Sequence, residues 1–475
     1  MKNLESFFKN TVQTLEQLTI SANQQWQPMS AGLQQQQQTM SCYNPPNASS
    51  AYHFNNASYS RLAIPDSNGH LQYPPYNDQG DRLLDFSGAG YNEGQEPPVN
   101  VPVVAYLDPV GQQDDSSRIQ YALDNLASKP VQHDGFRGAL QLNRGTYHLY
   151  QPLTLNASGI VLQGDPAGGT VLIGYENNHL INITGKPNTM DKKRVRIQGD
   201  VPVGSREIRV EKNKHHFRVG DTIVVGIHFN EEWIKAIGMD HIPPKGDLSK
   251  NNGWKPGRFE HLRRIVHIND DVLWLNEPIT TRLEQVYGGG YVQTYTNARV
   301  ERVGIQYLEC VFPANRGRGP DEIMKAEQGK VKDYRFAAEM FDHILVLMNH
   351  AENCWVRQVK SVWWRNFAQL GTNTLAITFQ ACEHTFPENV GKSPLPLVGQ
   401  FAFEISGQLI LIEQCHVEYS FHAYSFKGRI PGPNVVYQSD CVGKNGDVGP
   451  HMKWSSGQLY DSLMQVLDTD GRVPI

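Results

Sequence analysis

The sequence predicts an all-β fold in which short strands wind into a solenoid, and three observations support this. One phrase recurs, a short apolar run closed by a polar residue and a cysteine, as in VGIQYLEC, LAITFQAC and LILIEQC. The cysteines that close or follow such runs are spaced by 44, 28, 33 and 26 residues, which is typical of one coil repeated with loops of variable length. The 42 glycines and 28 prolines favour many turns over long helices. These cysteines are Cys310, Cys354, Cys382, Cys415 and Cys441.

We interpret the repeated cysteines as a buried stack and not as a disulfide set. A free cysteine packs as a small apolar residue, and equivalent sites in consecutive coils lie above one another. No two cysteines have CxxC spacing, so the pattern disfavours a zinc site.

Composition limits the classes of partner. The 475 residues carry a formal charge of −5, which argues against a general nucleic-acid binder, so affinity for an acidic ligand requires a local basic cluster. No apolar run is long enough to cross a membrane, and the opening MKNLESFFKN lacks the apolar core of a signal peptide. These sequence patterns do not indicate an oligomeric state.

We divide the chain into four segments. Residues 1–80 form a low-complexity arm rich in Gln, Asn, Ser and Pro, which we expect to be largely disordered. Residues 81–184 hold a capping helix, begun by Asp115 or Ser116, and the first coils. Residues 185–295 read as a small β-rich insertion with antiparallel strands, and residues 296–475 as the main coils.

The segments DFSGAGYNEG, DDSSRIQYAL, GALQLNRGTYHL and LNASGIVLQG resemble the opening of the pectate-lyase-like (pectin-lyase fold) superfamily. The resemblance covers roughly residues 82–180 and 296–472. It implies a right-handed parallel β-helix with three parallel sheets and an amphipathic helix capping the first coil. It implies less about activity, since that superfamily contains lyases, hydrolases, epimerases and non-catalytic proteins. It also implies a secreted or cell-surface location.

The C-terminal part resembles a bacterial group of unassigned activity, whose segments tend to read RHDF, GPNVF and GPHHRWATG. Here the first segment reads FHAY and the last GPHMKWSSG, so His422 and His451 remain while Phe421 and Ala423 replace the Arg and Asp. If the replaced pair oriented the site, activity is altered or absent. The resemblance also leads us to expect further coils beyond Ile475.

The candidate chemistry lies in three loops rich in basic and aromatic residues. Aromatic faces stack on sugar rings and cations neutralise uronate carboxylates, so the predicted partner is an acidic polysaccharide, and the predicted reaction is β-elimination by a lyase. We predict His422, His451 and Tyr424 as proton-transfer residues and Lys427 and Arg429 as carboxylate binders. The remaining predicted substrate-binding residues are Arg357, Lys360, Trp364, Arg365, Lys453 and Trp454.

Two alternatives stay open. Glu383 with His384 and Glu388, or Glu404 with Glu413, would suit glycoside hydrolysis by paired carboxylates or calcium binding. No aspartate cluster typical of calcium-dependent pectate lyases is present, so we assign no metal or cofactor and leave calcium open. The glutamine-rich arm and the altered FHAY segment favour instead a non-catalytic glycan-binding or adhesive protein.

Overall fold

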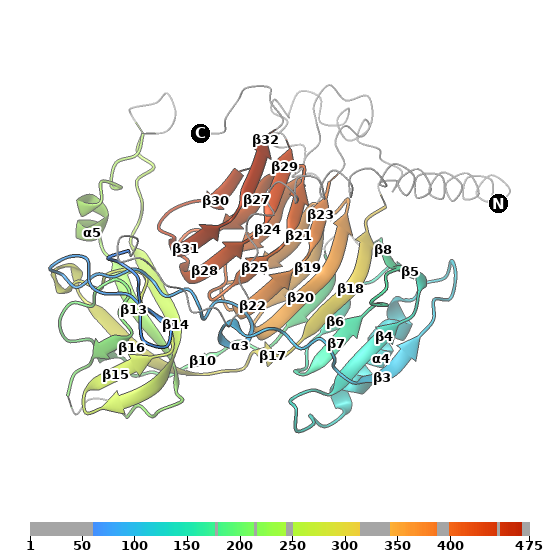
Figure 1. Cartoon of the computed structure of the whole chain (residues 1–475), viewed down its shortest axis with the longest axis horizontal. Helices are drawn as coiled ribbons and strands as arrows, with labels where there is room; N and C mark the ends of the chain where they lie inside the picture. The colour runs from blue at the N-terminus through green and yellow to red at the C-terminus, as the bar shows by residue number, and fades with distance from the viewer. Residues whose placement is uncertain are drawn as a thin grey trace. The chain divides into compact units, whose positions relative to one another are not determined.

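The computed structural model describes residues 60–175, 179–212, 216–243, 250–313, 343–386, 399–443 and 447–467. Most of the predicted low-complexity arm and Glu388 lie outside these residues. Within them the chain forms a parallel β-helix, which confirms the predicted fold class (Figure 1). Successive coils stack through three columns of parallel strands.

The first column joins the strands that open each coil. Its members are β3 (Val103–Leu107), β4 (Gly138–Leu142), β7 (Ile160–Gln163), β17 (Val300–Glu301), β18 (Gly304–Val311), β20 (Ala351–Val362), β22 (Leu375–Gln380), β25 (Leu411–Glu413), β28 (Pro431–Tyr437) and β31 (Ser456–Asp461).

The second column continues each coil after a bend, and the C-terminal halves of β18 and β20 belong to it. Its other strands are β5 (Gly145–Leu149), β8 (Thr170–Gly174), β23 (Glu383–Thr385), β26 (His416–Glu418), β29 (Asp440–Gly443) and β32 (Met464–Leu467).

The third column is a separate seven-stranded sheet. It contains β6 (Leu153–Leu155), β9 (His179–Thr184), β19 (Ile344–Asn349), β21 (Asn366–Leu370), β24 (Gly399–Ile405), β27 (Ser420–Phe426) and β30 (Asp447–Pro450).

The core follows from strand alternation and register. In the first column Val356 pairs with Phe379 and Phe379 with Ile412, so one apolar residue per coil stacks on the next inside the solenoid. The next residue along each strand points to the opposite face. This places Arg357, Gln380 and Glu413 in a polar line along the outer face. The repeated apolar runs of the sequence are therefore the inner faces of successive coils.

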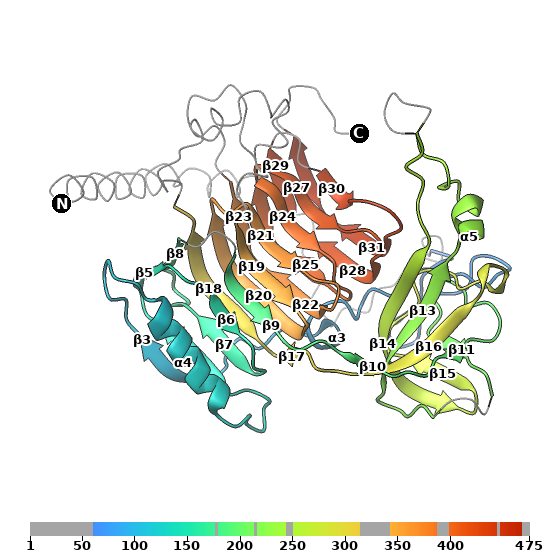
Figure 2. The ribbon, with the colours of Figure 1, turned by 180° about the vertical axis from the view of Figure 1, so that it is seen from behind.

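The capping helix is α4 (Ser116–Ser128), which packs against β4, β6 and β7 at the first coils (Figure 2). Ile119, Leu123 and Leu126 are its buried side chains. The N-cap residue is Asp115, one of the two predicted, but its side chain makes no capping hydrogen bond. Instead the Asp114 carboxylate accepts the backbone N–H of Ser116 at 2.8 Å.

The five described cysteines are all free and buried. Only part of the expected stack forms, because the register places Cys382 beside Cys415 but Cys441 beside Val417. Cys310 pairs with Ser361 in the second column, and Cys354 lies in the first. In this register Cys441 is aligned with Cys310, whereas Cys382 and Cys415 stand two positions earlier and Cys354 seven positions earlier.

The antiparallel insertion has its own core and pairs with the solenoid at one edge. It contains β10 (Thr189–Met190), β11 (Val195–Arg196), β12 (Glu207–Arg209), β13 (Thr222–Phe229), α5 (Glu231–Ala236), β14 (Gly257–Asn269), β15 (Val272–Leu275), the 3-10 turn η1 (Gln285–Tyr287) and β16 (Gly290–Thr296). A short hairpin, β1 (Ile64–Pro65) with β2 (Leu71–Gln72), precedes the helical turn α3 (Tyr91–Gly94).

Three contacts fix the insertion to the coils. The buried guanidinium of Arg263 donates to the backbone carbonyl of Gly432 in β28 at 2.7 Å. The side-chain amide of Gln408 bonds to the backbone of β14. Its oxygen accepts from the N–H of Leu262 at 3.0 Å, and its nitrogen donates to the carbonyl of Glu260 at 2.9 Å. Buried polar groups satisfied in this way hold the two parts in one arrangement.

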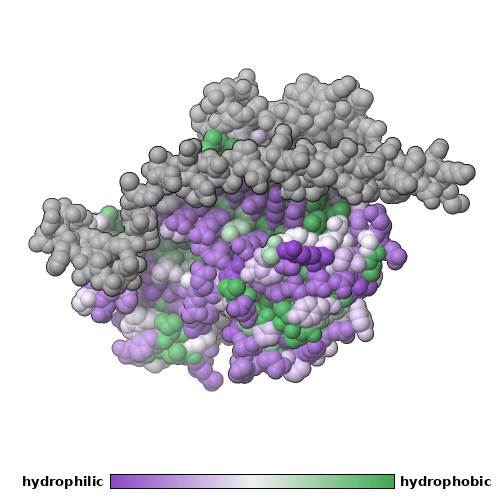
Figure 3. All heavy atoms as spheres, turned by 45° about the vertical axis from the view of Figure 1, so that its right-hand side comes forward, coloured by the Kyte–Doolittle hydropathy of each residue, from purple (hydrophilic) through white to green (hydrophobic). Residues whose placement is uncertain are grey.

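The described surface is mainly polar. On the face seen in Figure 3, hydrophilic residues cover most of that surface and apolar residues form small separate patches. Within the described ranges, no helix combines the length and the apolar character needed to span a membrane.

Candidate functional site

Two of the predicted histidines meet on the third column. The rings of His422, in β27, and His451, just after β30, have their centroids 4.6 Å apart, edge to face. His422 also stacks on the Phe401 ring at 4.4 Å, and His451 meets the edge of the same ring at 5.4 Å. His422 is largely buried and His451 is exposed, so the group has one covered and one solvent-facing imidazole.

Lys427 and Glu404 complete this group. The Lys427 ammonium lies 2.8 Å from the Glu404 carboxylate and 4.8 Å from the centre of the Phe401 ring. The second oxygen of Glu404 accepts from the Asn366 amide at 3.2 Å. We call Phe401, Glu404, His422, Lys427 and His451 the histidine cluster.

The parallel register explains why these side chains converge. Phe401 pairs with His422 across β24 and β27, and the pairing of β27 with β30 shifts register between His422 and Tyr424. The backbone N–H of His451 donates to the carbonyl of Phe426 at 2.8 Å, which continues the same sheet by one coil. Phe401 and His451, which are 50 positions apart in sequence, thus lie on the two sides of β27.

Two predicted site residues are interior instead. Tyr424 is fully buried, and its hydroxyl donates to the backbone carbonyls of Cys415 and Asp440, both at 2.9 Å. Burial raises the pKa of Tyr424 well above its ordinary value. Trp364 is also fully buried, with its indole N–H on the Cys310 carbonyl at 3.2 Å. Neither side chain is within reach of a polymer, so the structure does not support their predicted roles.

Two further predicted residues, Arg429 and Trp454, contact the insertion, and a third, Lys453, lies beside them in sequence. The Arg429 guanidinium donates to the backbone carbonyl of Lys255. Trp454 donates to the Thr281 hydroxyl at 2.6 Å and packs edge-on against the Trp233 ring at 5.1 Å. Lys453 precedes Trp454 and is exposed. The reason for this placement is that the turns joining the third column to the first carry these residues, and the insertion packs there.

Two of the remaining basic residues lie on other columns. Arg357 is nearly buried on the first column, donates to the Pro97 carbonyl at 2.8 Å and so holds the chain segment before β3. Lys360 pairs in register with Glu383 on the second column. Arg365 immediately precedes β21 on the third column and is next in sequence to Asn366, which donates to Glu404 of the histidine cluster.

The predicted Glu404–Glu413 pair is not formed, and Glu388, the carboxylate predicted to act with Glu383, lies outside the described residues. Glu404 lies on the third column and Glu413 on the first, so the two face different sides of the solenoid. Glu383 points outward, whereas His384 is fully buried and hydrogen-bonded to Ser361 at 3.1 Å. Among the described residues no group of three or more His, Cys, Asp or Glu side chains is arranged to hold a metal ion.

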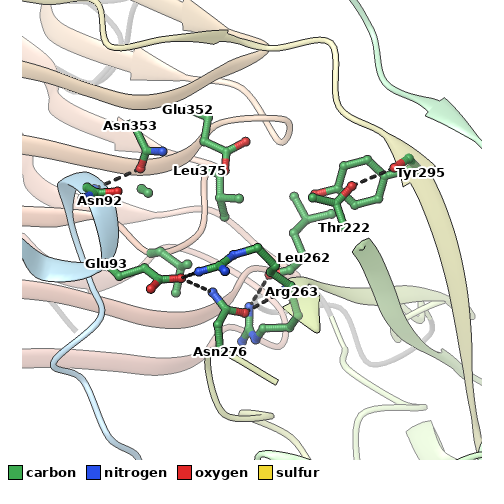
Figure 4. Close-up of a pocket in the computed structure, with 13 residues that line it drawn as sticks. Asn92, Glu93, Thr222, Leu262, Arg263, Asn276, Tyr295, Glu352, Asn353 and Leu375 are labelled. Atoms are coloured by element: carbon green, nitrogen blue, oxygen red, sulfur yellow. Dashed lines mark hydrogen bonds and ion pairs between the residues drawn. The ribbon is translucent and has the colours of Figure 1, made fainter. Parts of the chain in front are cut away.

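A pocket of about 330 Å³ lies where the insertion meets the coils (Figure 4). Sequence patterns do not reveal it, because its walls come from three segments far apart in the chain: residues 92–93, positions between 222 and 295 of the insertion, and positions between 352 and 409 of the coils. Its lining residues are Asn92, Glu93, Thr222, Leu262, Arg263, Arg264, Asn276, Tyr295, Glu352, Asn353, Leu375, Ala376 and Leu409. Burial raises the pKa of the Glu352 carboxyl above its ordinary value, although Arg299 acts in the opposite direction.

Comparison with known proteins gives a fold-level similarity. No family model and no curated protein matches the sequence. Among solved structures, the chain is similar to the tailspike protein gp49 from Pseudomonas phage LKA1, with 10% identity, a TM-score of 0.34 and coverage of 74% of this chain and 52% of the tailspike. It thus spans about half the length of that protein.

Two enzymes show similar values. The endo-xylogalacturonan hydrolase from Aspergillus tubingensis has 9% identity and a TM-score of 0.35, with 77% of this chain and 78% of the hydrolase covered. The iota-carrageenase from A. fortis has 10% identity and a TM-score of 0.31, with 78% and 58% covered. Similarities this distant carry no argument about the function of this chain.

Proposed function

We propose that this protein acts on an acidic polysaccharide and cleaves a uronic-acid-containing polymer by β-elimination at the histidine cluster. The observation that carries this proposal is the 4.6 Å approach of the His422 and His451 rings, with the Lys427 ammonium beside the same Phe401 ring. Two imidazoles and a cation on one outer sheet supply the types of group that this reaction requires.

The proposed chemistry assigns a step to each group. His451, the exposed imidazole, takes the proton from the carbon next to the uronate carboxylate. The electron pair of that C–H bond forms a carbon–carbon double bond as the glycosidic C–O bond breaks, and a proton from His422 or water goes to the departing oxygen. Imidazole suits both roles, because its ordinary pKa lies near neutrality.

Lys427 neutralises the substrate carboxylate in this scheme. An ammonium has three donor hydrogens, and the Glu404 contact at 2.8 Å engages one of them. A substrate carboxylate can therefore bind the same ammonium. Charge neutralisation is necessary because the proton becomes acidic enough only when the enolate that forms is stabilised.

The same ion pair favours a second candidate, a binding protein that holds the polymer without cleaving it. Glu404 already compensates the charge of Lys427, which weakens its stabilisation of an enolate. The replacement of Arg and Asp by Phe421 and Ala423, relative to the bacterial group that the sequence resembles, points in the same direction.

The test is incubation with a panel of uronate polymers, following the ultraviolet absorbance of the unsaturated product. We expect absorbance with at least one polymer and a loss of about 100-fold or more in the His451→Ala variant. His133→Ala, which changes an exposed histidine elsewhere, is the matched control and should retain full activity.

Three other results would contradict the lyase proposal. New reducing ends without absorbance would indicate hydrolysis. Polymer binding without absorbance and without new reducing ends would show that the protein binds the polymer but does not cleave it. Equal activity in the wild type and in His451→Ala would remove the reaction from the histidine cluster.

A further inference from the structure

We infer that the pocket between the insertion and the coils is a binding site for a neutral, hydroxyl-rich saccharide unit. This site is separate from the histidine cluster, and the inference does not depend on the reaction proposed there. It rests on the shape of the pocket, on its apolar side and on the kind of polar atoms that it offers.

The pocket is built from rigid parts. The backbone N–H of Asn92 donates to the Asn353 amide at 2.9 Å, and the N–H of Gly90 donates to the Leu409 carbonyl at 2.9 Å. Together with the Arg263 and Gln408 contacts between insertion and coils, these bonds hold the walls in place without a ligand. Its volume of about 330 Å³ lies within the range of small-molecule sites.

One side of the pocket is apolar. Leu262 comes from β14, while Leu375 and Leu409 come from two successive coils, and all three are nearly buried. Sugar rings have C–H faces that pack on such surface while their hydroxyls remain at the edges. This combination of an apolar wall and a polar rim is typical of small-ligand sites.

The polar rim offers mainly hydrogen-bond acceptors. One oxygen of Glu93 accepts from Arg264 and from Asn276 at 2.9 Å, and the structure gives the other oxygen no partner among the described residues (Figure 4). One oxygen of Glu352 accepts from Asn297 at 2.8 Å and lies 3.4 Å from Arg299. Its other oxygen likewise has no partner within the described part of the chain. Free carboxylate oxygens require a ligand that donates, as hydroxyl groups do.

The charges around the pocket disfavour a uronate. Arg264 pairs with Glu93, and Arg299 with Glu352, so both cations are already compensated. The buried Arg263 directs its guanidinium to backbone carbonyls, including that of Pro278 at 2.7 Å. In the described ranges, each lining cation already has an oxygen partner, so a ligand carboxylate would have to compete with Glu93 for Arg264 and would be repelled by Glu93 and Glu352.

The test measures binding of neutral monosaccharides to the full chain by saturation-transfer NMR and calorimetry, with glucuronate and galacturonate as the acidic arm. We expect at least one neutral sugar to bind and the uronates to bind at least tenfold more weakly. Two variants address the pocket directly: Glu93→Gln changes an acceptor at the rim, and Ala376→Met fills the pocket from its wall. Each should weaken binding at least tenfold.

Controls separate this result from misfolding and from the lyase proposal. Glu207→Gln, an exposed change on β12, should bind like the wild type, as should His451→Ala. If Glu93→Gln lowers the melting temperature, its weaker binding could come from misfolding. In that case the affinity of Ala376→Met, provided that its melting temperature is unchanged, decides whether the pocket binds the sugar. The inference is overturned if no neutral sugar binds, if uronates bind as well as neutral sugars, or if both folded pocket variants retain full affinity. None of these outcomes changes the expected polymer cleavage at the histidine cluster.

Discussion

The Nδ1 atom of His416 lies 2.6 Å from the Asp440 carboxylate, one coil further along the second column. Its Nε2 lies 3.3 Å from Glu418, so one imidazole bridges two carboxylates. Burial alone would lower the pKa of His416, but the hydrogen bonds to Asp440 and Glu418 outweigh it and raise the pKa to about 10. This histidine is therefore charged at neutral pH and joins consecutive coils.

The first prediction concerns stability against pH. Because the folded pKa of His416 is above the ordinary 6.5, its contribution is fully present below about pH 6.5 and is lost as the pH rises through about 10. We expect His416→Gln to lower the free energy of unfolding by about 1–2 kcal/mol at pH 6, allowing for solvent screening of a partly exposed group, and by much less at pH 10.5. Urea denaturation at both pH values measures this.

The control for this prediction is His133→Gln, which should follow the wild-type pH profile. A deficit of His416→Gln that is equal at both pH values would show that the side chain contributes packing and not charge.

The second prediction concerns the attachment of the insertion. Arg263 is buried and donates only to oxygens, among them the carbonyls of Pro278 and Gly432 at 2.7 Å. We expect Arg263→Met to lower the free energy of unfolding by about 3 kcal/mol or more, because several buried carbonyls lose their partner. Thermal denaturation measures the loss, and limited proteolysis should then cut first within the insertion. Arg258→Met, at an exposed position of the same strand, should change neither result by a measurable amount.

The third prediction concerns the cysteines. All five described thiols are buried, and burial raises the pKa of Cys354 to about 12, which suppresses the reactive thiolate. In a Cys42→Ser background, which removes the one cysteine outside the described residues, we expect no reaction of the native protein with a thiol reagent. Five equivalents should react in denaturant. Rapid reaction of the native protein, or a melting temperature that falls when reductant is added, would contradict this.

The fourth prediction concerns Gly304 in β18. It pairs in register with Trp355 of the next coil, and a Cβ at this glycine would lie 2.3 Å from the indole. We expect Gly304→Ala to destabilise the protein by about 1–3 kcal/mol through overpacking. The double variant Gly304→Ala/Trp355→Phe should recover part of this loss, since the smaller ring leaves room. Additive losses in that double-mutant cycle would show that the two residues do not interact.

The fold class could be predicted because its signal is local and repeated. Each coil must bury an apolar run against the coils on both sides, so residues such as Val356, Phe379 and Ile412 recur with turn residues between them. The amphipathic pattern of α4 is equally local, and Ile119 and Leu123 are buried as that pattern predicts.

The site was predictable only in part. His422 lies in β27, Lys427 directly after it and His451 directly after β30, and the stacking of coils brings them together. Tyr424 has the same sequence neighbourhood but is fully buried, with its hydroxyl on two backbone carbonyls. Residues two positions apart on a strand share one face by alternation, so sequence spacing cannot separate the cluster residue His422 from the interior Tyr424.

The sequence by itself determined that this chain winds into stacked coils, since burial of repeated apolar runs requires only contacts between neighbouring coils. Tertiary structure alone decided where the insertion packs. That placement turned Arg429 and Trp454 into attachment residues and enclosed Glu93, Arg264 and Glu352 around one pocket. The physical reason is that these contacts join segments far apart along the chain, through single side chains that have no repeated pattern.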